Sequence, residues 1–194
     1  KKINITGKVI LFFGYIRDYK GLMYLINAMP NILKRMELTL LIVGEVWEGN
    51  DKYHQQVKKL GIENNVRIID NYVPDDNVCY YYSACDLVVL PYLTATNSGI
   101  VQIAFGFEKP VIITNVGGLP EVVSHEKTGL VIPPKDSKSI EEAVIRFYKE
   151  NLGEKFKENI IKEKERFSWE RMVEVIENLG EKEWRFLSQE EVVF

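Results

Sequence analysis

Six short apolar runs, rich in valine, isoleucine, leucine and phenylalanine, place the strongest constraint on how this chain can fold. Their hydrophobicity is continuous rather than alternating, which indicates strands that are covered on both faces. The runs occupy residues 9–14, 38–44, 66–70, 86–92, 110–115 and 129–134. Segments with apolar residues at three- and four-residue spacing separate them, so the pattern predicts an α/β fold with an open parallel sheet of about six strands.

The helices between these strands are predicted from the same spacing. The apolar face of the first helix consists of Leu22, Leu25, Ile26, Met29 and Leu33. Three more helices are predicted around residues 57–60, 78–85 and 100–107. We expect Asp75 or Asp76 to cap the helix around residues 78–85.

After residue 134 the pattern predicts helices only. The first is capped by Asp136, Ser137 or Ser139, the second covers residues 154–166, and the last opens at Ser168. The chain contains no internal repeat, low-complexity tract or linker. We therefore expect residues 1–194 to form a single domain with extra helices at its carboxyl end.

Composition excludes several classes of function. A net charge of −3 and a pI near 5.6 argue against a surface devoted to nucleic acid. Cys79 and Cys85 belong to no CxxC motif, and neither His54 nor His125 has partners arranged for zinc or a catalytic triad, so we expect no metal site. No charged-then-apolar leader begins the sequence, and no apolar run approaches the ~18 residues of a membrane span. We expect a soluble, cytoplasmic protein, with attachment to the cytoplasmic face of the membrane as the alternative.

The stretch from Thr94 to Asn115 carries the strongest functional signal. Its sequence, TATNSGIVQIAFGFEKPVIITN, places a polar loop after a strand and opens a helix at Ser98 and Gly99. Backbone N–H groups without partners and the positive end of the helix dipole attract anions there, and glycine lets a ligand approach the backbone. The pattern predicts a phosphate site, although an ordinary capped helix start has the same residue types.

The loop after the first strand, GYIRDYKG over residues 14–21, has neither the dinucleotide motif GxGxxG nor the Walker motif GxxxxGKS/T. It supports neither an NAD site nor a P-loop ATP site. Arg17 offers a fork for two phosphate oxygens and Lys20 a mobile point charge, a pair suited to a diphosphate. The alternative is a solvated basic loop, since exposed lysine and arginine are common.

A third loop, NYVPDD over residues 71–76, lies between a predicted strand and a predicted helix. Its backbone around Tyr72 and Val73 could pair with a flat ring, or the turn could serve only to change the chain direction. In open parallel sheets, ligands bind beyond the carboxyl ends of the strands, near the point where strand order reverses. These three loops therefore form the predicted site.

Several motifs occur in a characteristic order along the chain. They are GYIRDYKGL, LLIVGE, VRIIDNYVPDDNV, YYSACDLVVLPY, SGIVQIAFGFEKPVI, TNVGGLPEVV and TGLVIPPKD. Together, over about residues 9–179, they resemble the carboxy-terminal, nucleotide-sugar-binding half of retaining glycosyltransferases of the GT-B fold, in the group 1 (GT4-type) family. The resemblance implies a Rossmann-like domain, with a separate amino-terminal domain that holds the acceptor. We expect that domain in a longer form of the same chain rather than in a partner chain.

The resemblance also assigns the diphosphate contacts. Lys20 matches the family's lysine on the donor diphosphate. The family's arginine follows the first glycine, where this chain has Tyr15, so we assign the arginine role to Arg17. Both side chains would stabilise the departing diphosphate. The predicted phosphate cradle consists of the backbone N–H groups of Ser98, Gly99 and Ile100.

Other substrate contacts are predicted in the same way. Tyr72 and Val73 match the loop that meets the nucleotide base. The remaining predicted substrate-binding residues are Gly14, Thr96, Asn97 and Gln102. Glu121, in the motif VGGLPEVV, is expected to anchor its turn rather than to bind substrate.

One departure from the family concerns two glutamates, seven residues apart, that commonly flank the phosphate-binding helix start. Here no carboxylate occurs between Asp86 and Glu108. Depending on the alignment, the second position holds Ile103 or Gln102, and glutamine forms a weaker hydrogen bond than a charged group does. Donor binding is therefore more strongly predicted than turnover.

The resemblance implies transfer of a sugar from a UDP-sugar or GDP-sugar to a carbohydrate or lipid-linked acceptor, with retained anomeric configuration and without a metal or other cofactor. The isolated domain is expected to be inactive by itself. The alternative is a non-catalytic nucleotide-sugar-binding module or a degenerate glycosyltransferase domain. A GT-B-like epimerase would need catalytic carboxylates and histidines that the sequence lacks, and a flavodoxin-like signalling domain would need acidic residues after the first strand.

Overall fold

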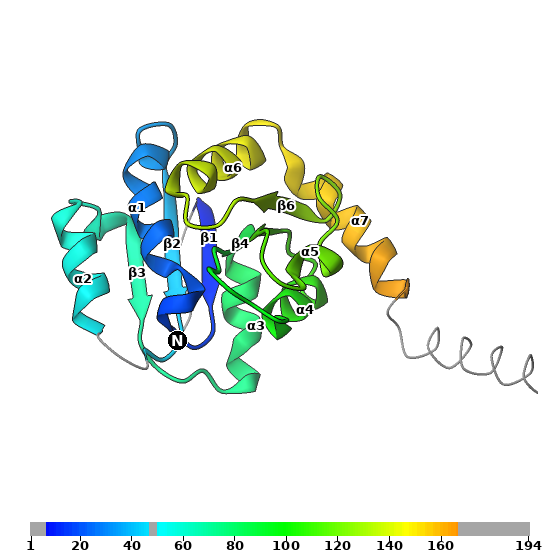
Figure 1. Cartoon of the computed structure of the whole chain (residues 1–194), viewed down its shortest axis with the longest axis horizontal. Coiled ribbons are helices and arrows are strands. Elements are labelled where there is room, and N and C mark those ends of the chain that lie inside the picture. Colours follow the sequence, from blue (N-terminus) through cyan, green and yellow to red (C-terminus); the bar gives the residue numbers. More distant parts are fainter. Residues whose placement is uncertain (1–6, 47–49, 167–194) are drawn as a thin grey trace, which may run out of the picture. The chain divides into compact units, whose positions relative to one another are not determined.

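The computed structural model describes residues 7–46 and 50–166, which contain a six-stranded parallel sheet. The strand order is β3-β2-β1-β4-β5-β6. The strands are β1 (Lys8–Phe13), β2 (Leu38–Val43), β3 (Val66–Ile69), β4 (Leu87–Leu90), β5 (Val111–Thr114) and β6 (Gly129–Ile132). The predicted open parallel sheet is confirmed (Figure 1).

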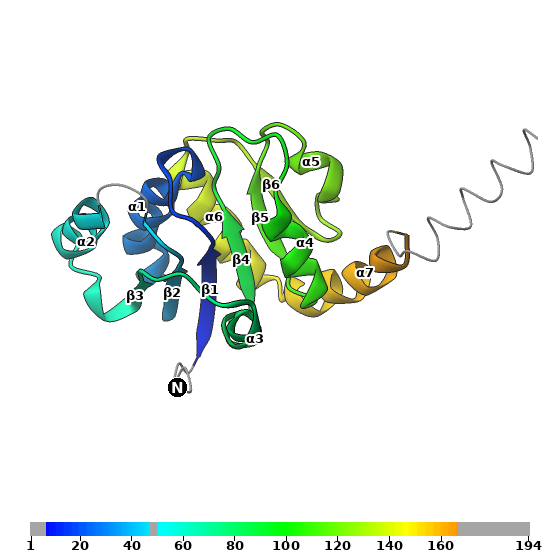
Figure 2. The ribbon, with the colours of Figure 1, turned by 90° about the horizontal axis from the view of Figure 1, so that it is seen from below.

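Helices cover both faces of the sheet, as predicted (Figure 1 and Figure 2). The α-helices are α1 (Leu22–Leu33), α2 (Asn50–Lys59), α3 (Asp75–Ala84), α4 (Gly99–Gly106), α5 (Leu119–Val122), α6 (Ser137–Lys149) and α7 (Leu152–Arg166). Two short 3-10 turns, η1 (Asp18–Lys20) and η2 (Glu63–Asn65), precede α1 and β3.

Successive residues of each buried strand point to opposite faces of the sheet, so the residues of one strand belong to two hydrophobic clusters. Ile10 and Phe12 of β1 pack with residues of α1, α2 and α6. Val9, Leu11 and Phe13 pack with residues of α3, α4 and α5. This double burial explains why the strands read as continuous rather than alternating apolar runs.

The helix boundaries confirm some predictions and correct others. Asp136 caps α6, because its carboxylate accepts a hydrogen bond from the Lys138 N–H at 2.9 Å. The predicted cap of α3 is wrong, since Pro74 occupies that position and both Asp75 and Asp76 lie inside the first turn. Carboxylates are favourable there because they face the positive end of the helix dipole.

Two other boundaries differ in length or position. The helix predicted over residues 154–166 begins earlier, at Leu152. The four-residue helix α5 was not predicted, because so short a segment cannot show a helical period. The last predicted helix, from Ser168, lies outside the described residues.

Contacts group Lys1–Ile160 into one compact unit, which contains the sheet, and Ile161–Phe194 into another. That residues 1–194 form a single domain stays a prediction. None of the described helices combines the length and the apolar character that crossing a bilayer requires.

The loops that follow β1 and β4 touch at a glycine. Gly21 has φ 67°, in the left-handed region, and a Cβ added to it would lie 1.9 Å from the carbonyl oxygen of Pro91. Only glycine allows this approach, because any side chain would overlap the opposing backbone. The same loops are joined by a hydrogen bond from the Leu93 N–H to the Tyr19 carbonyl, at 2.7 Å.

This contact predicts that Gly21→Ala lowers the free energy of unfolding by more than the cost of a left-handed alanine. Gly61→Ala is the matched control, since Gly61 has φ 66° but nothing within 4 Å of its added Cβ. The control should lose about 1 kcal/mol from backbone strain alone. Urea unfolding of both variants measures the difference, and equal losses would contradict the proposed contact.

Candidate functional site

The strand order reverses between β1 and β4, which makes this the switch point of the sheet. The loop after β1, residues 14–21, and the loop after β4, residues 91–98, both lie at the carboxyl ends of their strands. Ligands of open parallel sheets bind at this place. The Gly21–Pro91 approach described above fixes the two loops against each other.

Two hollows open beside these loops. The larger hollow, of about 600 Å³, is lined by Tyr19, Lys20, Tyr92, Thr94, Ala95, Thr96, Asn97, Ser98, Gly99, Ile100 and Ile103. The smaller hollow, of about 230 Å³, is lined by Phe13, Gly14, Tyr15, Lys20, Gly44, Glu45, Tyr72, Val73, Asp75, Val78, Ile100 and Ile103. Because Lys20, Ile100 and Ile103 line both, the two hollows meet at these residues.

Lys20 is a buried cation at that junction. Its residue is 7% exposed, and its Nζ lies 5.6 Å from the ring centroid of Tyr92. Burial, and to a smaller extent the nearby charge of Arg17, together lower the pKa of Lys20 to about 8. No carboxylate within residues 7–46 and 50–166 forms an ion pair with it. An ammonium group in this position would be stabilised strongly by a bound anion.

The start of α4 lines the larger hollow and has no side-chain cap. Ser98 occupies the N-cap position, but its side chain forms no capping hydrogen bond, and its Oγ lies 3.5 Å from the Tyr92 hydroxyl. A Cβ added to Gly99 would have nothing within 4 Å. The first N–H groups of a helix lack partners within the helix, which leaves those of Gly99 and Ile100 available to a ligand. The neighbouring N–H groups already have partners, since that of Ser98 donates to the Asn97 side chain and that of Val101 to the Ser98 carbonyl, both at 3.2 Å. This arrangement suits an anion with several oxygens.

The family model of the group 1 glycosyl transferases matches residues 1–167. The chain belongs to the group 1 glycosyltransferases. An uncharacterized glycosyltransferase of Methanocaldococcus jannaschii is 30% identical over 177 residues, which are 89% of this chain and 44% of that protein. This chain therefore spans less than half the length of that curated relative.

Solved structures agree on the fold. The carboxy-terminal domain of LpcC, a group 1 glycosyl transferase of Francisella tularensis, superposes with a TM-score of 0.72 at 24% identity, covering 79% of this chain and 82% of that chain. HepE of Anabaena, in complex with UDP, superposes with a TM-score of 0.75 at 24% identity, covering 89% of this chain and 48% of that chain. The predicted carboxy-terminal domain of a GT-B glycosyltransferase is confirmed.

Within this glycosyltransferase domain, the structure brings most of the predicted site residues together. Those that line the larger hollow are Thr96, Asn97, Ser98 and Gly99; those that line the smaller one are Gly14, Tyr72 and Val73; Lys20 and Ile100 line both. Two predicted residues stand apart from this group. Arg17 and Gln102 are exposed and line neither hollow. The assigned roles stay predictions for all of them.

Sequence reasoning missed several lining residues. Tyr92 is 3% exposed, and burial raises its pKa to about 12, although the hydrogen bond with Ser98 acts in the opposite direction. Its ring meets that of Tyr19 edge-on at 6.2 Å between centroids. Glu45 and Asp75 contribute carboxylates to the smaller hollow. Glu45 directly follows an apolar run and Asp75 lies in the predicted loop of residues 71–76, but nothing in the sequence showed that the two line one cavity.

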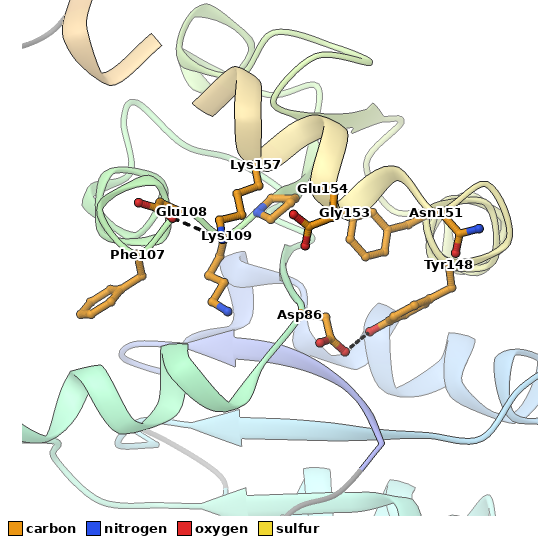
Figure 3. Close-up of a pocket in the computed structure, with 11 residues that line it drawn as sticks. Asp86, Phe107, Glu108, Lys109, Tyr148, Asn151, Gly153, Glu154 and Lys157 are labelled. Carbon is orange, nitrogen blue, oxygen red and sulfur yellow. Dashed lines mark hydrogen bonds and ion pairs between the residues drawn. The ribbon is translucent and has the colours of Figure 1, made fainter. Parts of the chain in front are cut away.

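A third hollow, of about 340 Å³, lies at the amino ends of the strands and includes Asp86, which directly precedes β4. Figure 3 shows Asp86 and Tyr148 pointing toward one another, and the Tyr148 hydroxyl lies 3.1 Å from the Asp86 carboxylate. The same carboxylate accepts a hydrogen bond from the Val9 N–H at 2.8 Å. Asp86 therefore ties α6 to the start of β1, which is a structural role.

Reactive and metal-binding groups are few in the described part of the chain. No three His, Cys, Asp or Glu side chains are grouped there as a metal would require. Cys79 and Cys85 are free thiols, and burial raises the pKa of Cys85 to about 12, which keeps it protonated. His125 accepts a hydrogen bond at Nδ1 from the Val131 N–H at 2.9 Å. These residues are explained by packing and local structure.

The lowered pKa of Lys20 predicts that Lys20→Met stabilises the ligand-free domain at pH 7. Between pH 8 and the ordinary lysine value of 10.5, the unfolded chain binds more protons than the folded one, so wild-type stability rises with pH in this window. The advantage of the variant should therefore be largest below pH 8 and should shrink toward pH 10.5. Urea unfolding at pH 7, 9 and 10.5 measures it.

Lys58→Met is the control, since Lys58 is an exposed lysine of α2 and methionine has a similar helix propensity. It should change stability little at any of these pH values. If Lys20→Met were less stable than wild type at pH 7, this would contradict the claim that the Lys20 ammonium group is buried and poorly solvated.

Proposed function

We propose that this domain binds a nucleoside diphosphate sugar across the two hollows and, with a second domain, transfers the sugar to an acceptor with retention. The observation that carries the proposal is the position of Lys20, a buried cation that lines both hollows beside the uncapped start of α4. The diphosphate would lie between the Lys20 ammonium and the backbone N–H groups of Ser98, Gly99 and Ile100. The UDP bound to HepE supports a donor of this class.

The remaining parts of the donor would follow from this placement. The base would occupy the smaller hollow beside Tyr72 and Val73, and Gly14, without a side chain, would leave room beside the Lys20 ammonium, since an added Cβ would lie 3.2 Å from its Nζ. The sugar would occupy the larger hollow, where Thr96 and Asn97 offer hydroxyl and amide groups. UDP-sugars and GDP-sugars both have this chemistry.

The chemistry requires stabilisation of negative charge. When the bond between sugar and diphosphate breaks, the sugar becomes oxocarbenium-like and the leaving group gains charge. Lys20 and the α4 amides would stabilise that charge in the transition state. Arg17 would add a second cation after its exposed side chain turns toward the donor, and Gln102 would reach a donor hydroxyl in the same manner. No metal is required in this scheme.

The acceptor, a saccharide or a lipid-linked sugar, would bind mainly to the second domain. Because this chain spans 44% of its curated relative, we propose that the second domain belongs to a longer form of the same protein. The isolated domain would then bind donor without transferring the sugar. Attachment to the cytoplasmic face of a membrane would bring a lipid-linked acceptor within reach.

A non-catalytic nucleotide-sugar-binding module is the second candidate. None of the residues that line the larger hollow is a carboxylate, so within the described chain no acidic group contacts the proposed sugar position. Both candidates bind nucleotide, and only sugar transfer by the complete protein distinguishes them.

The proposed function predicts that Lys20→Ala lowers the transfer rate of the full-length enzyme by about 100-fold or more, as loss of one oxyanion-stabilising donor does. Calorimetry on this domain should detect UDP or GDP with wild type and weaker binding with Lys20→Ala. Rates are measured in EDTA, because the proposed site uses protein groups alone. An unchanged rate in the variant, or an absolute need for a divalent cation, would contradict the proposal.

The open space at Gly99 predicts that Gly99→Ala weakens UDP or GDP binding by about tenfold or more without lowering stability, since its methyl group would occupy the place of a phosphate oxygen. Gly106→Ala is the matched control. Gly106 ends the same helix and likewise has nothing within 4 Å of its added Cβ. Equal nucleotide affinity in both variants, measured by calorimetry, would contradict the proposed position of the phosphates at the start of α4.

A further inference from the structure

We infer that Glu45 accepts hydrogen bonds from the ribose hydroxyls of the bound nucleoside diphosphate. This inference rests on the proposed function and extends it to a residue that sequence reasoning did not assign to the site. Glu45 follows β2 at the carboxyl end of the sheet and lines the smaller hollow together with Lys20 and Tyr72.

The backbone around Glu45 is held from three sides. The Glu45 carbonyl accepts a hydrogen bond from the Ile16 N–H at 2.9 Å. The N–H of Gly44 donates to the Ile69 carbonyl at 3.0 Å, and the N–H of Val46 donates to the Asp70 carboxylate at 2.7 Å. The carboxylate of Glu45 therefore extends from a fixed backbone between the loops that follow β1 and β3, as a binding group must.

The Gly44 backbone also packs closely on the loop after β1, residues 14–21. A Cβ added to Gly44 would lie 2.2 Å from the carbonyl oxygen of Gly14, which begins the loop that carries Lys20. Glu45 therefore directly follows Gly44, whose backbone contacts the loop that carries Lys20. Tyr72, which would meet the base, lies on the loop that follows β3, on the other side of β2 in the sheet.

The order of groups in the ligand matches this arrangement. A nucleoside diphosphate places its ribose between the base and the phosphates. With the base beside Tyr72 and the phosphates beside Lys20, the ribose lies in the part of the smaller hollow next to Glu45. The ribose presents two adjacent hydroxyl donors, and a carboxylate has two oxygens that accept such donors with charge-assisted strength.

The carboxylate of Glu45 is available for this role. Glu45 is exposed and forms no ion pair with any residue in the ranges 7–46 and 50–166. Asp75 is the other carboxylate of the smaller hollow, but it lies in the first turn of α3, next to the loop that would meet the base. An exposed glutamate can also be a solvated surface residue, and the fixed backbone inside a shared hollow favours the binding role.

Calorimetry with three ligands tests the inference on this domain. The ligands are UDP, 2′,3′-dideoxy-UDP, which lacks both ribose hydroxyls, and inorganic pyrophosphate. Wild type should bind UDP about tenfold more tightly than the dideoxy form, the scale of a hydrogen bond to a charged group. Glu45→Ala should remove most of that preference while leaving pyrophosphate affinity equal or higher, because a negative charge has been removed.

Asp75→Asn is the matched control, since it neutralises the other carboxylate of the same hollow. It should keep the preference for UDP over the dideoxy form. Glu45→Gln, which keeps the shape of the side chain, should retain part of the preference. Thermal unfolding of Glu45→Ala and Glu45→Gln should match wild type, because the Glu45 side chain is exposed.

The outcomes separate this inference from the function on which it rests. Binding of UDP with an unchanged preference over the dideoxy form in Glu45→Ala would overturn the role of Glu45 alone. Failure of wild type to bind UDP, GDP and pyrophosphate would overturn the proposed function as well.

Discussion

The close approach of the loops after β1 and β4 is the constraint on which the site depends. Gly21 lies against the Pro91 carbonyl because it has no side chain, and this contact closes the switch point of the sheet. The residue before it, Lys20, is thereby buried beside Tyr92 instead of extending into water. Lys20 lines both hollows. The position of their shared cation therefore depends on the contact between the Gly21 and Pro91 backbones.

The sequence was sufficient for the sheet and for most of its helices, because continuous apolar runs and helical spacing report burial directly. It was not sufficient for the N-cap of α3. Asp75 and Asp76 were the predicted caps, but Pro74 occupies the N-cap position. The helix α5 has only four residues, too few for a repeating apolar spacing to appear in the sequence. These differences concern single turns, whose geometry depends on neighbours that are distant in the sequence.

The site shows the same limit. Loop motifs pointed to Lys20, Tyr72 and the start of α4, which the structure places around two connected hollows. Arg17 satisfied the same charge criterion but is exposed outside both, since it precedes the 3-10 turn η1 in an extended conformation, whereas Lys20 ends that turn and is buried. Glu45 had no distinguishing motif, and only the register of β1, β2 and β3 brings it beside the other residues.

The burial of Lys20 has a consequence for the history of this protein. A buried, poorly solvated cation would be a liability in a chain that binds no anion, since exchange for an apolar residue would relieve the cost of burying the charge. Under the proposed function, the buried lysine would be retained for anion recognition, even though this chain lacks the acidic pair that the resemblance leads us to expect.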